Sequence, residues 1–242
     1  MSMNEGRRSQ PRRSVAKGAG GRKAPRPRPM PRAERRGQLL AVAREIIEAQ
    51  GIGALTMSAL AEQSGAAKPV VYEHFENSEA VAVALLEDTF ARTITFVTAR
   101  AEGAEDIDAY MAVVIDSLFE FQTLERSIVR KITNGFSSNS AVNAVYLDQQ
   151  KRAVDVYRDL IEQQGVARPA ARVAAYALNA MVDGTIPEFA VRANTTLARD
   201  TLKRLVSGAI HSLAPVQGPR PHTPAAILRY GADKPKARRP KT

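Results

Sequence analysis

Apolar residues recur at three- and four-residue steps along the chain between residues 37 and 214, and this helical periodicity limits the fold more than any other feature. The stretch RRGQLLAVAREIIEAQG is typical, because its apolar side chains share one helical face. Gly51 follows the last of them, in the position where helices commonly end. We therefore predict an all-α fold.

Basic charge is concentrated at the two ends of the chain. Residues 1–36 carry twelve Lys and Arg against two acidic residues, and this +10 equals the formal charge of all 242 residues. Residues 215–242 add seven basic residues and one acidic residue, whereas residues 37–214 have 16 basic and 22 acidic side chains. Both ends are rich in Pro, Gly and Arg, so we expect no packed core there. The basic arm suits attraction to nucleic acid, with solubility or a plain linker as the alternative.

Several functional classes are excluded or disfavoured by composition. The chain has no cysteine and only three histidines, none within one helical turn of another, so we expect no disulfide, no metal site and no cofactor. The longest apolar run, residues 80–86, is too short to cross a bilayer, and we predict a cytoplasmic protein with no membrane partner. No Gly-rich phosphate loop, nucleophile elbow or paired-carboxylate motif stands out, so we expect no enzyme.

Three short helices are predicted before residue 76, within about 45 residues. Thr56 can cap the helix MSALAEQS, and Gly65 can end it in a left-handed conformation. The third helix covers residues 68–75, and Pro69 is tolerated because it falls in the first turn. A tight glycine turn between the last two helices is the layout of a helix-turn-helix.

The stretch LTMSALAEQSGAAKPVVYEHFENSEAV carries a pattern at Thr56, Leu60, Ala61, Gly65, Tyr72, His74, Phe75, Asn77 and Ser78. It resembles the DNA-binding domain of the tetracycline-repressor (TetR) family of bacterial transcription regulators. The resemblance implies a helix-turn-helix domain over 32–77 and an effector-binding and dimerisation domain of six or so helices over 78–214. Composition predicts a disordered basic arm over 1–31 and a disordered basic tail over 215–242.

In that family the third helix enters the major groove of double-stranded DNA. By position, the resemblance places Lys68, Pro69 and Val70 at base edges. Lysine can donate to guanine, and apolar side chains suit the thymine methyl group. Tyr72 and His74 would then reach backbone phosphates, which position a protein without reading sequence.

Further contacts are implied from the first two helices. Thr56 and Ser58 resemble the family's phosphate and base contacts, and Arg35 and Arg36 would add backbone attraction. For His74 a structural role is also open, as a half-buried residue that packs the second helix against the fourth. The two roles do not exclude each other.

The chain departs from the family pattern at three positions near the third helix. Ala67 stands where a Ser or Thr cap is usual, Ser78 where many members have lysine, and Glu76 where a basic residue is expected. We expect the arginines at the start of the fold to supply the missing backbone attraction.

Six further helices are predicted, at about residues 78–101, 107–123, 125–135, 140–164, 169–192 and 197–213. Pro187 should kink the fifth of them. Family members pair through their last two helices, so the resemblance implies a homodimer built on residues 169–213, with a monomeric helix pair as the alternative. Small residues would allow close approach there: Ala174, Ala177, Ala180 and Gly208.

A small-molecule effector is expected among the helices of this larger domain. Its candidate pocket residues are Tyr110, Val114, Phe119, Arg130, Tyr146 and Met181. Core packing is the alternative for the apolar ones, and solvent exposure is the alternative for Arg130. The opening PRAERRGQLL is similar to lipid-metabolism regulators of this family that sense acyl-thioesters, so an acyl-thioester or another lipophilic ligand is implied.

The resemblance thus implies a sequence-specific transcription regulator, by family default a repressor that a lipophilic effector releases from a palindromic operator. The alternative is a sequence-indifferent packaging protein that binds nucleic acid through its basic ends. A helical body over residues 78–214 is larger than a packaging protein needs for dimerisation alone.

Overall fold

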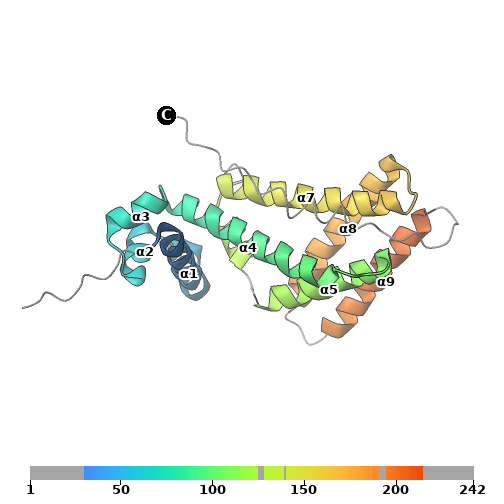
Figure 1. The fold of residues 1–242 in the computed structure, drawn as a ribbon, viewed down its shortest axis with the longest axis horizontal. Helices are drawn as coiled ribbons and strands as arrows, with labels where there is room; N and C mark the ends of the chain where they lie inside the picture. Colours follow the sequence, from blue (N-terminus) through green and yellow to red (C-terminus); the bar gives the residue numbers. More distant parts are fainter. Residues whose placement is uncertain (1–29, 125–127, 139, 191–194, 215–242) are drawn as a thin grey trace, which may run out of the picture.

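A computed structural model of the chain describes residues 30–124, 128–138, 140–190 and 195–214, and the regular elements within them are all helices, as predicted (Figure 1). Their bounds are α1 (Arg32–Gln50), the short 3₁₀ helix η1 (Ile52–Ala54), α2 (Met57–Ser64), α3 (Lys68–His74), α4 (Ser78–Ala101), α5 (Ile107–Leu124), α6 (Ile128–Asn134), α7 (Ala141–Gln163), α8 (Arg168–Phe189) and α9 (Thr195–Leu213). The predicted basic tail and nearly all of the basic arm lie outside the described residues.

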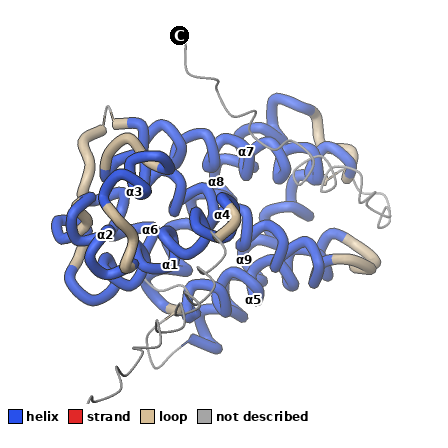
Figure 2. Tube along the Cα trace, turned by 60° about the vertical axis from the view of Figure 1, so that its left-hand side comes forward, coloured by secondary structure: helices blue, strands red, loops and turns tan. Residues whose placement is uncertain are grey.

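The helices form two regions joined by one long helix. Helices α1, α2 and α3 make a small bundle, here called the head, at one end of the molecule (Figure 1). Helix α4 leaves the head and runs along the larger region of α5, α7, α8 and α9, here called the body. A second view shows α6 beside α1, against the head (Figure 2).

Local start and stop signals act as the sequence predicts. The Thr56 hydroxyl accepts a hydrogen bond from the Ala59 amide at 3.0 Å and caps α2. Gly65 ends α2 with φ +65°, a conformation that costs glycine little because it has no Cβ. Helix α3 ends at His74, one residue earlier than predicted, because Phe75 turns to an extended conformation that buries its side chain.

The helices near the C-terminus differ slightly from their predicted limits. Helix α8 begins at Arg168 and ends at Phe189, and the remaining residues of its predicted span are only partly described. Pro187 lies inside the last turn of α8, so the helix continues past it by two residues. The kink at Pro187 stays a prediction.

Two apolar cores hold the molecule together. The body core joins α5, α7, α8 and α9, with Phe119 and Ile115 fully buried at its centre. The head core contains the predicted inward face of α1 and also Ile128 and Ile132 of α6, both fully buried. The head core therefore extends past residue 77, where the sequence predicts the end of the DNA-binding domain.

Candidate nucleic-acid interface and ligand cavity

Helix α3 presents one continuous face to solvent. Lys68, Pro69 and Tyr72 are exposed, with Tyr72 at 54%, and Val70 is half-buried. Val71 is fully buried and holds the opposite face against the head core. The exposed Tyr72 side chain is therefore available for contact with another molecule.

The start of α2 belongs to the same helix-turn-helix as α3. Thr56 and Ser58 are both exposed, although the Thr56 hydroxyl is already engaged as the cap of its helix. Ala67, before α3, forms no side-chain cap, in agreement with the departure seen in the sequence. The residues predicted from α2 and α3 to contact DNA are thus solvent-accessible, and their contacts with DNA stay predictions.

Arginines from the first turns of α1 lie beside the C-terminal end of α3. Arg32 Nη2 donates to the Glu73 carbonyl at 3.4 Å, and the Arg36 guanidinium lies 5.0 Å from the centre of the Phe75 ring. Arg35 donates to the Gln38 side chain. The contacts of Arg32 and Arg36 place two cations next to a helix whose own basic residues are Lys68 and His74.

His74 is half-buried, and its ring centre lies 6.4 Å from that of Phe75. Burial lowers its pKa, and the nearby positive charge of Arg32 lowers it further, while Glu73 acts in the opposite direction. The imidazole is therefore mainly neutral near pH 7. Half-burial fits the packing role, and a neutral imidazole can still donate one hydrogen bond to a phosphate.

A cavity of about 210 Å³ lies in the body between α4, α5, α6, α7 and α8. Most of its wall is apolar, with side chains from all five helices. The lining residues are Phe90, Thr93, Ile94, Val97, Thr98, Tyr110, Val114, Leu118, Phe121, Val129, Tyr146, Gln149, Gln150, Ala153, Val156, Tyr157, Asn179, Val182, Asp183, Ile186 and Pro187.

Three of the six predicted pocket residues line this cavity: Tyr110, Val114 and Tyr146. The other three do not, and this corrects the sequence-based prediction. Phe119 is fully buried in the body core, with the Arg199 guanidinium 5.3 Å from its ring centre. Arg130 is exposed on α6, and Met181 packs against the body core on another face of α8.

Helix α4 supplies five lining residues that the sequence analysis did not identify, between Phe90 and Thr98. Their spacing of three and four residues was a usable signal, because such a stripe marks one face of a helix. The polar lining residues were missed for a different reason, since polar residues on amphipathic helices ordinarily face solvent.

The polar lining forms a chain of hydrogen bonds from α8 through α7 and back to α8. Asn179 Nδ2 donates to Gln150 Oε1 at 3.0 Å, Gln150 Nε2 donates to the Tyr146 oxygen at 2.6 Å, and the Tyr146 hydroxyl donates to Asp183 Oδ2 at 3.1 Å. Burial raises the pKa of Tyr146, and the charge of Asp183 raises it further. The hydroxyl therefore keeps its proton at neutral pH.

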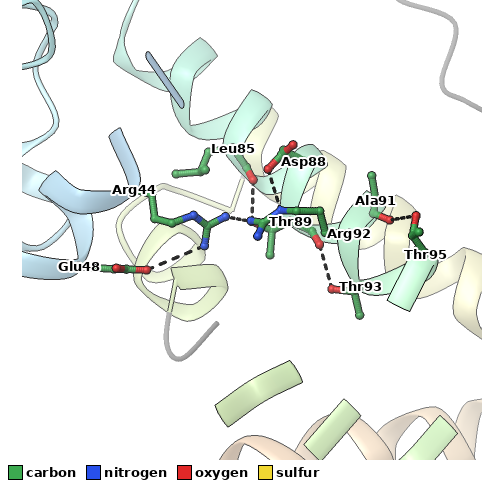
Figure 3. A network of polar contacts seen from close by, with 9 residues as sticks. All are labelled: Arg44, Glu48, Leu85, Asp88, Thr89, Ala91, Arg92, Thr93 and Thr95. Atoms are coloured by element: carbon green, nitrogen blue, oxygen red, sulfur yellow. Dashed lines mark hydrogen bonds and ion pairs between the residues drawn. The ribbon is translucent and has the colours of Figure 1, made fainter. Parts of the chain in front are cut away.

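Polar contacts also tie α1 to the helices that line the cavity. Arg44 on α1 donates to the Thr89 hydroxyl on α4 at 3.0 Å, and Thr89, fully buried, donates to the Leu85 carbonyl at 2.8 Å (Figure 3). One turn further along α1, Lys131 of α6 donates to the Glu48 carbonyl at 2.9 Å.

A close backbone approach reinforces the contact at α6. A Cβ added at Gly135, just after α6, would lie 2.2 Å from a side-chain carbon of Ile52 in η1. A larger residue fits there only if the Ile52 side chain or the two segments shift.

Two further features of the described residues concern metal binding and the membrane. In the described ranges, no three His, Cys, Asp or Glu side chains gather closely enough to hold a metal ion. None of the described helices combines the length and apolarity needed to cross a bilayer.

Comparison with known proteins agrees with the geometry of the head. The sequence model of the family described as "Bacterial regulatory proteins, tetR family" matches residues 39–85, which include α2 and α3. The HTH-type transcriptional activator FasR of Mycolicibacterium smegmatis is 28% identical over 172 residues, covering 70% of this chain and 78% of that protein.

Solved structures share the fold of the whole helical region. SCO4454, a TetR-family regulator from Streptomyces coelicolor, has a TM-score of 0.63 at 19% identity, over 76% of this chain and 97% of that one. A complex of SmeT with triclosan has a TM-score of 0.57 at 20% identity, over 78% and 96% of the two chains. Together, the match of residues 39–85 to the tetR-family model and the similarity to FasR identify the chain as a DNA-binding transcription regulator, and its helical region has the fold of TetR-family regulators.

Proposed function

We propose that the chain acts as a homodimer that binds a palindromic operator through α3 and changes its DNA affinity when a small molecule occupies the cavity in the body. Lys68, Pro69 and Val70 would read bases. Tyr72 and His74 would position the helix on phosphates. The exposure of Lys68, Pro69 and Tyr72 supports this assignment, as does the half-exposure of Val70 and His74.

Backbone attraction would come from α1 and α2. Arg35 and Arg36, together with Thr56 and Ser58, are proposed phosphate contacts. The observation in favour of the arginines is the position of Arg32 and Arg36 at the C-terminal end of α3, where they contact the Glu73 carbonyl and the Phe75 ring. We place this activity in the cytoplasm, where bacterial operators lie.

Dimerisation through α8 and α9 is supported by the apolar side chains these helices expose. Six of the large exposed hydrophobic residues belong to these two helices: Val173, Tyr176, Phe189, Leu197, Leu205 and Leu213. Small exposed residues, including Ala177, Ala180 and Gly208, lie on the same two helices and permit close approach. A second copy of the chain would cover this surface and hold two reading helices about one turn of DNA apart.

The cavity supports an effector with a mainly apolar body. SmeT, a protein of the same fold, forms a complex with triclosan. The family resemblance implied an acyl-thioester or another lipophilic ligand, and the cavity distinguishes these candidates by the head group that its polar lining can hold. FasR is described as a transcriptional activator. For this chain we propose repression, and measuring transcription from the operator with and without the protein decides between the two.

The single observation that carries the proposal is the position of α6 between the cavity and the head. Val129 lines the cavity, while its neighbours Ile128 and Ile132 are buried in the head core. A ligand that displaces Val129 would therefore strain contacts inside the head. Arg44 and Thr89 form a second link, through α4, one turn before the lining residue Thr93.

The test is selection of bound DNA from a random pool, followed by measurement of the selected site against random DNA. We expect one palindromic site to be protected, whereas equal protection of all DNA would favour the packaging alternative. Candidate lipophilic ligands are then titrated into the complex. If none of those that bind the cavity changes DNA affinity, the effector part of the proposal is wrong.

A further inference from the structure

We propose that the cavity selects an apolar molecule whose head group donates hydrogen bonds and is neutral or positively charged, as in an alkyl amine, and that Asp183, Tyr146 and Gln150 hold this head group. The inference rests on the effector-regulated function proposed above, because it names the chemical class of ligand for the same cavity.

The apolar part of the ligand is set by the walls. Ile94 and Val97 from α4, Val114 and Leu118 from α5, and Val156 from α7 line the cavity without offering any side-chain hydrogen bond. Burying apolar ligand surface against such walls is favourable, whereas burying a polar group there without a partner is costly. A ligand must therefore direct its polar group to the polar lining.

Among the polar lining residues, the hydrogen-bond chain described above has a direction. Each donor points from Asn179 through Gln150 and Tyr146 toward Asp183, where the chain ends on a carboxylate. The Tyr146 proton is already used in this chain, and the raised pKa of the phenol keeps it in place. Asp183 itself can only accept hydrogen bonds while ionised, so the end of the chain favours a ligand that donates.

The charge of the lining points the same way. Asp183 is the one charged residue in the lining formed by the described residues, and no described Lys or Arg lines the cavity or pairs with Asp183. Arg130, the one cation among the predicted pocket residues, is exposed outside the lining. An ammonium group beside Asp183 would be attracted, whereas a carboxylate there would be repelled.

The inference is tested by calorimetric titration of the full-length protein, without DNA, using decylamine, decanol and decanoate below their micelle concentrations. These probes share the length of their chain and differ in the charge of the head group at pH 7. We expect decylamine to bind about tenfold more tightly than decanoate, with decanol between them, because attraction and repulsion at Asp183 both contribute.

Asp183→Asn removes the charge with little change of shape, and the exposed position of the residue makes loss of folding unexpected. We expect this variant to bring the decylamine and decanoate affinities to within about threefold of each other. Asp148→Asn is the matched control, because Asp148 is also an exposed aspartate of the region but lies outside the lining and pairs with Arg152. It should keep the wild-type order.

Tighter binding of decanoate than of decylamine to the wild type would overturn the inference. So would an unchanged preference in Asp183→Asn, or the binding of none of the three probes. Release of DNA is measured separately on the same protein. If decylamine binds as expected but leaves DNA affinity unchanged, the ligand class stands and the proposed effector function fails.

Discussion

The proposed DNA-binding surface of the head and the proposed ligand cavity of the body are built in different ways. The surface lies mainly on the seven consecutive residues of α3, with arginines from the neighbouring turns of α1. The cavity collects side chains from five helices between Phe90 and Pro187. A surface on one short helix depends on local signals, whereas a cavity depends on how several helices are rotated against each other. Single substitutions should therefore remove separate contacts in the head but act through assembly and packing in the body.

The largest effect is expected from a charge in the proposed dimer surface. Ala180→Asp would bury a carboxylate without a partner, which costs several kcal/mol. We expect monomers in sedimentation and loss of specific operator binding, because one half-site alone holds the head weakly. Ala91→Asp, at an exposed position on α4, is the control and should stay dimeric. A variant Ala180→Asp that remains a dimer would remove α8 from the interface.

Deletion of residues 1–31 tests how far DNA affinity depends on charge outside the reading helix. Each neutralised phosphate changes the slope of log K against log salt by about −0.9, so we expect the slope to flatten by several units in a dimer. All DNA sequences should be weakened alike, since Lys68, Pro69 and Val70 remain. An unchanged slope would show that the arm does not reach DNA, and lost sequence preference would place the reading surface elsewhere.

Lys68→Ala should remove one base contact and leave the rest of the head intact. We expect a cost of about 1–3 kcal/mol on the selected operator and relaxed preference at one position of each half-site. The measurement is competition binding of operator and random DNA. An equal loss of affinity on both would mean that Lys68 contacts only phosphate.

Thr89→Val tests the link between the two regions. The substitution keeps the shape of the side chain but leaves Arg44 without its acceptor on α4 (Figure 3), so we expect the free energy of unfolding to fall by about 1–2 kcal/mol. Thr95→Val is the control, because the Thr95 hydroxyl is exposed and donates only within its own helix, to the Ala91 carbonyl. If the two variants have equal free energies of unfolding in urea denaturation, the hydrogen bond from Arg44 to Thr89 does not stabilise the contact between α1 and α4.

The smallest effect is expected from the pH dependence at His74. Its pKa is lowered in the protein, mainly by burial and then by Arg32, so near and below about pH 6.5 the unfolded chain binds more protons than the folded one. Stability without DNA should therefore fall as the pH falls through this window. A phosphate beside the ring would raise the pKa of His74 again, because it favours the charged imidazolium. DNA affinity should therefore rise slightly as the pH falls through the same window.

His74→Ala should remove both pH effects. Tyr72→Phe provides the comparison, because it removes a proposed phosphate contact that does not titrate near neutral pH, and it should weaken binding equally at every pH. If the pH dependence of DNA affinity is the same in His74→Ala and wild type, His74 has only the packing role.

Much of the head could be predicted from sequence because its signals are local. The Thr56 cap, the left-handed Gly65 and the buried face of α1 each depend on residues within a few positions of one another. The body was predicted less completely. Its helix limits were recognised to within a few residues, but Phe119, Arg130 and Met181 were placed in a pocket that they do not line.

The sequence by itself determined that the chain is helical and where most helices begin and end, because periodicity and caps act over one or two turns. The tertiary structure alone decided which face of each body helix lines the cavity, that α6 packs Ile128 and Ile132 into the head core, and that Arg44 meets Thr89 from 45 residues away. The physical reason is that helical periodicity shows which residues of a helix are buried together but contains no information about the neighbour that buries them. That choice is made only when all the helices pack at once.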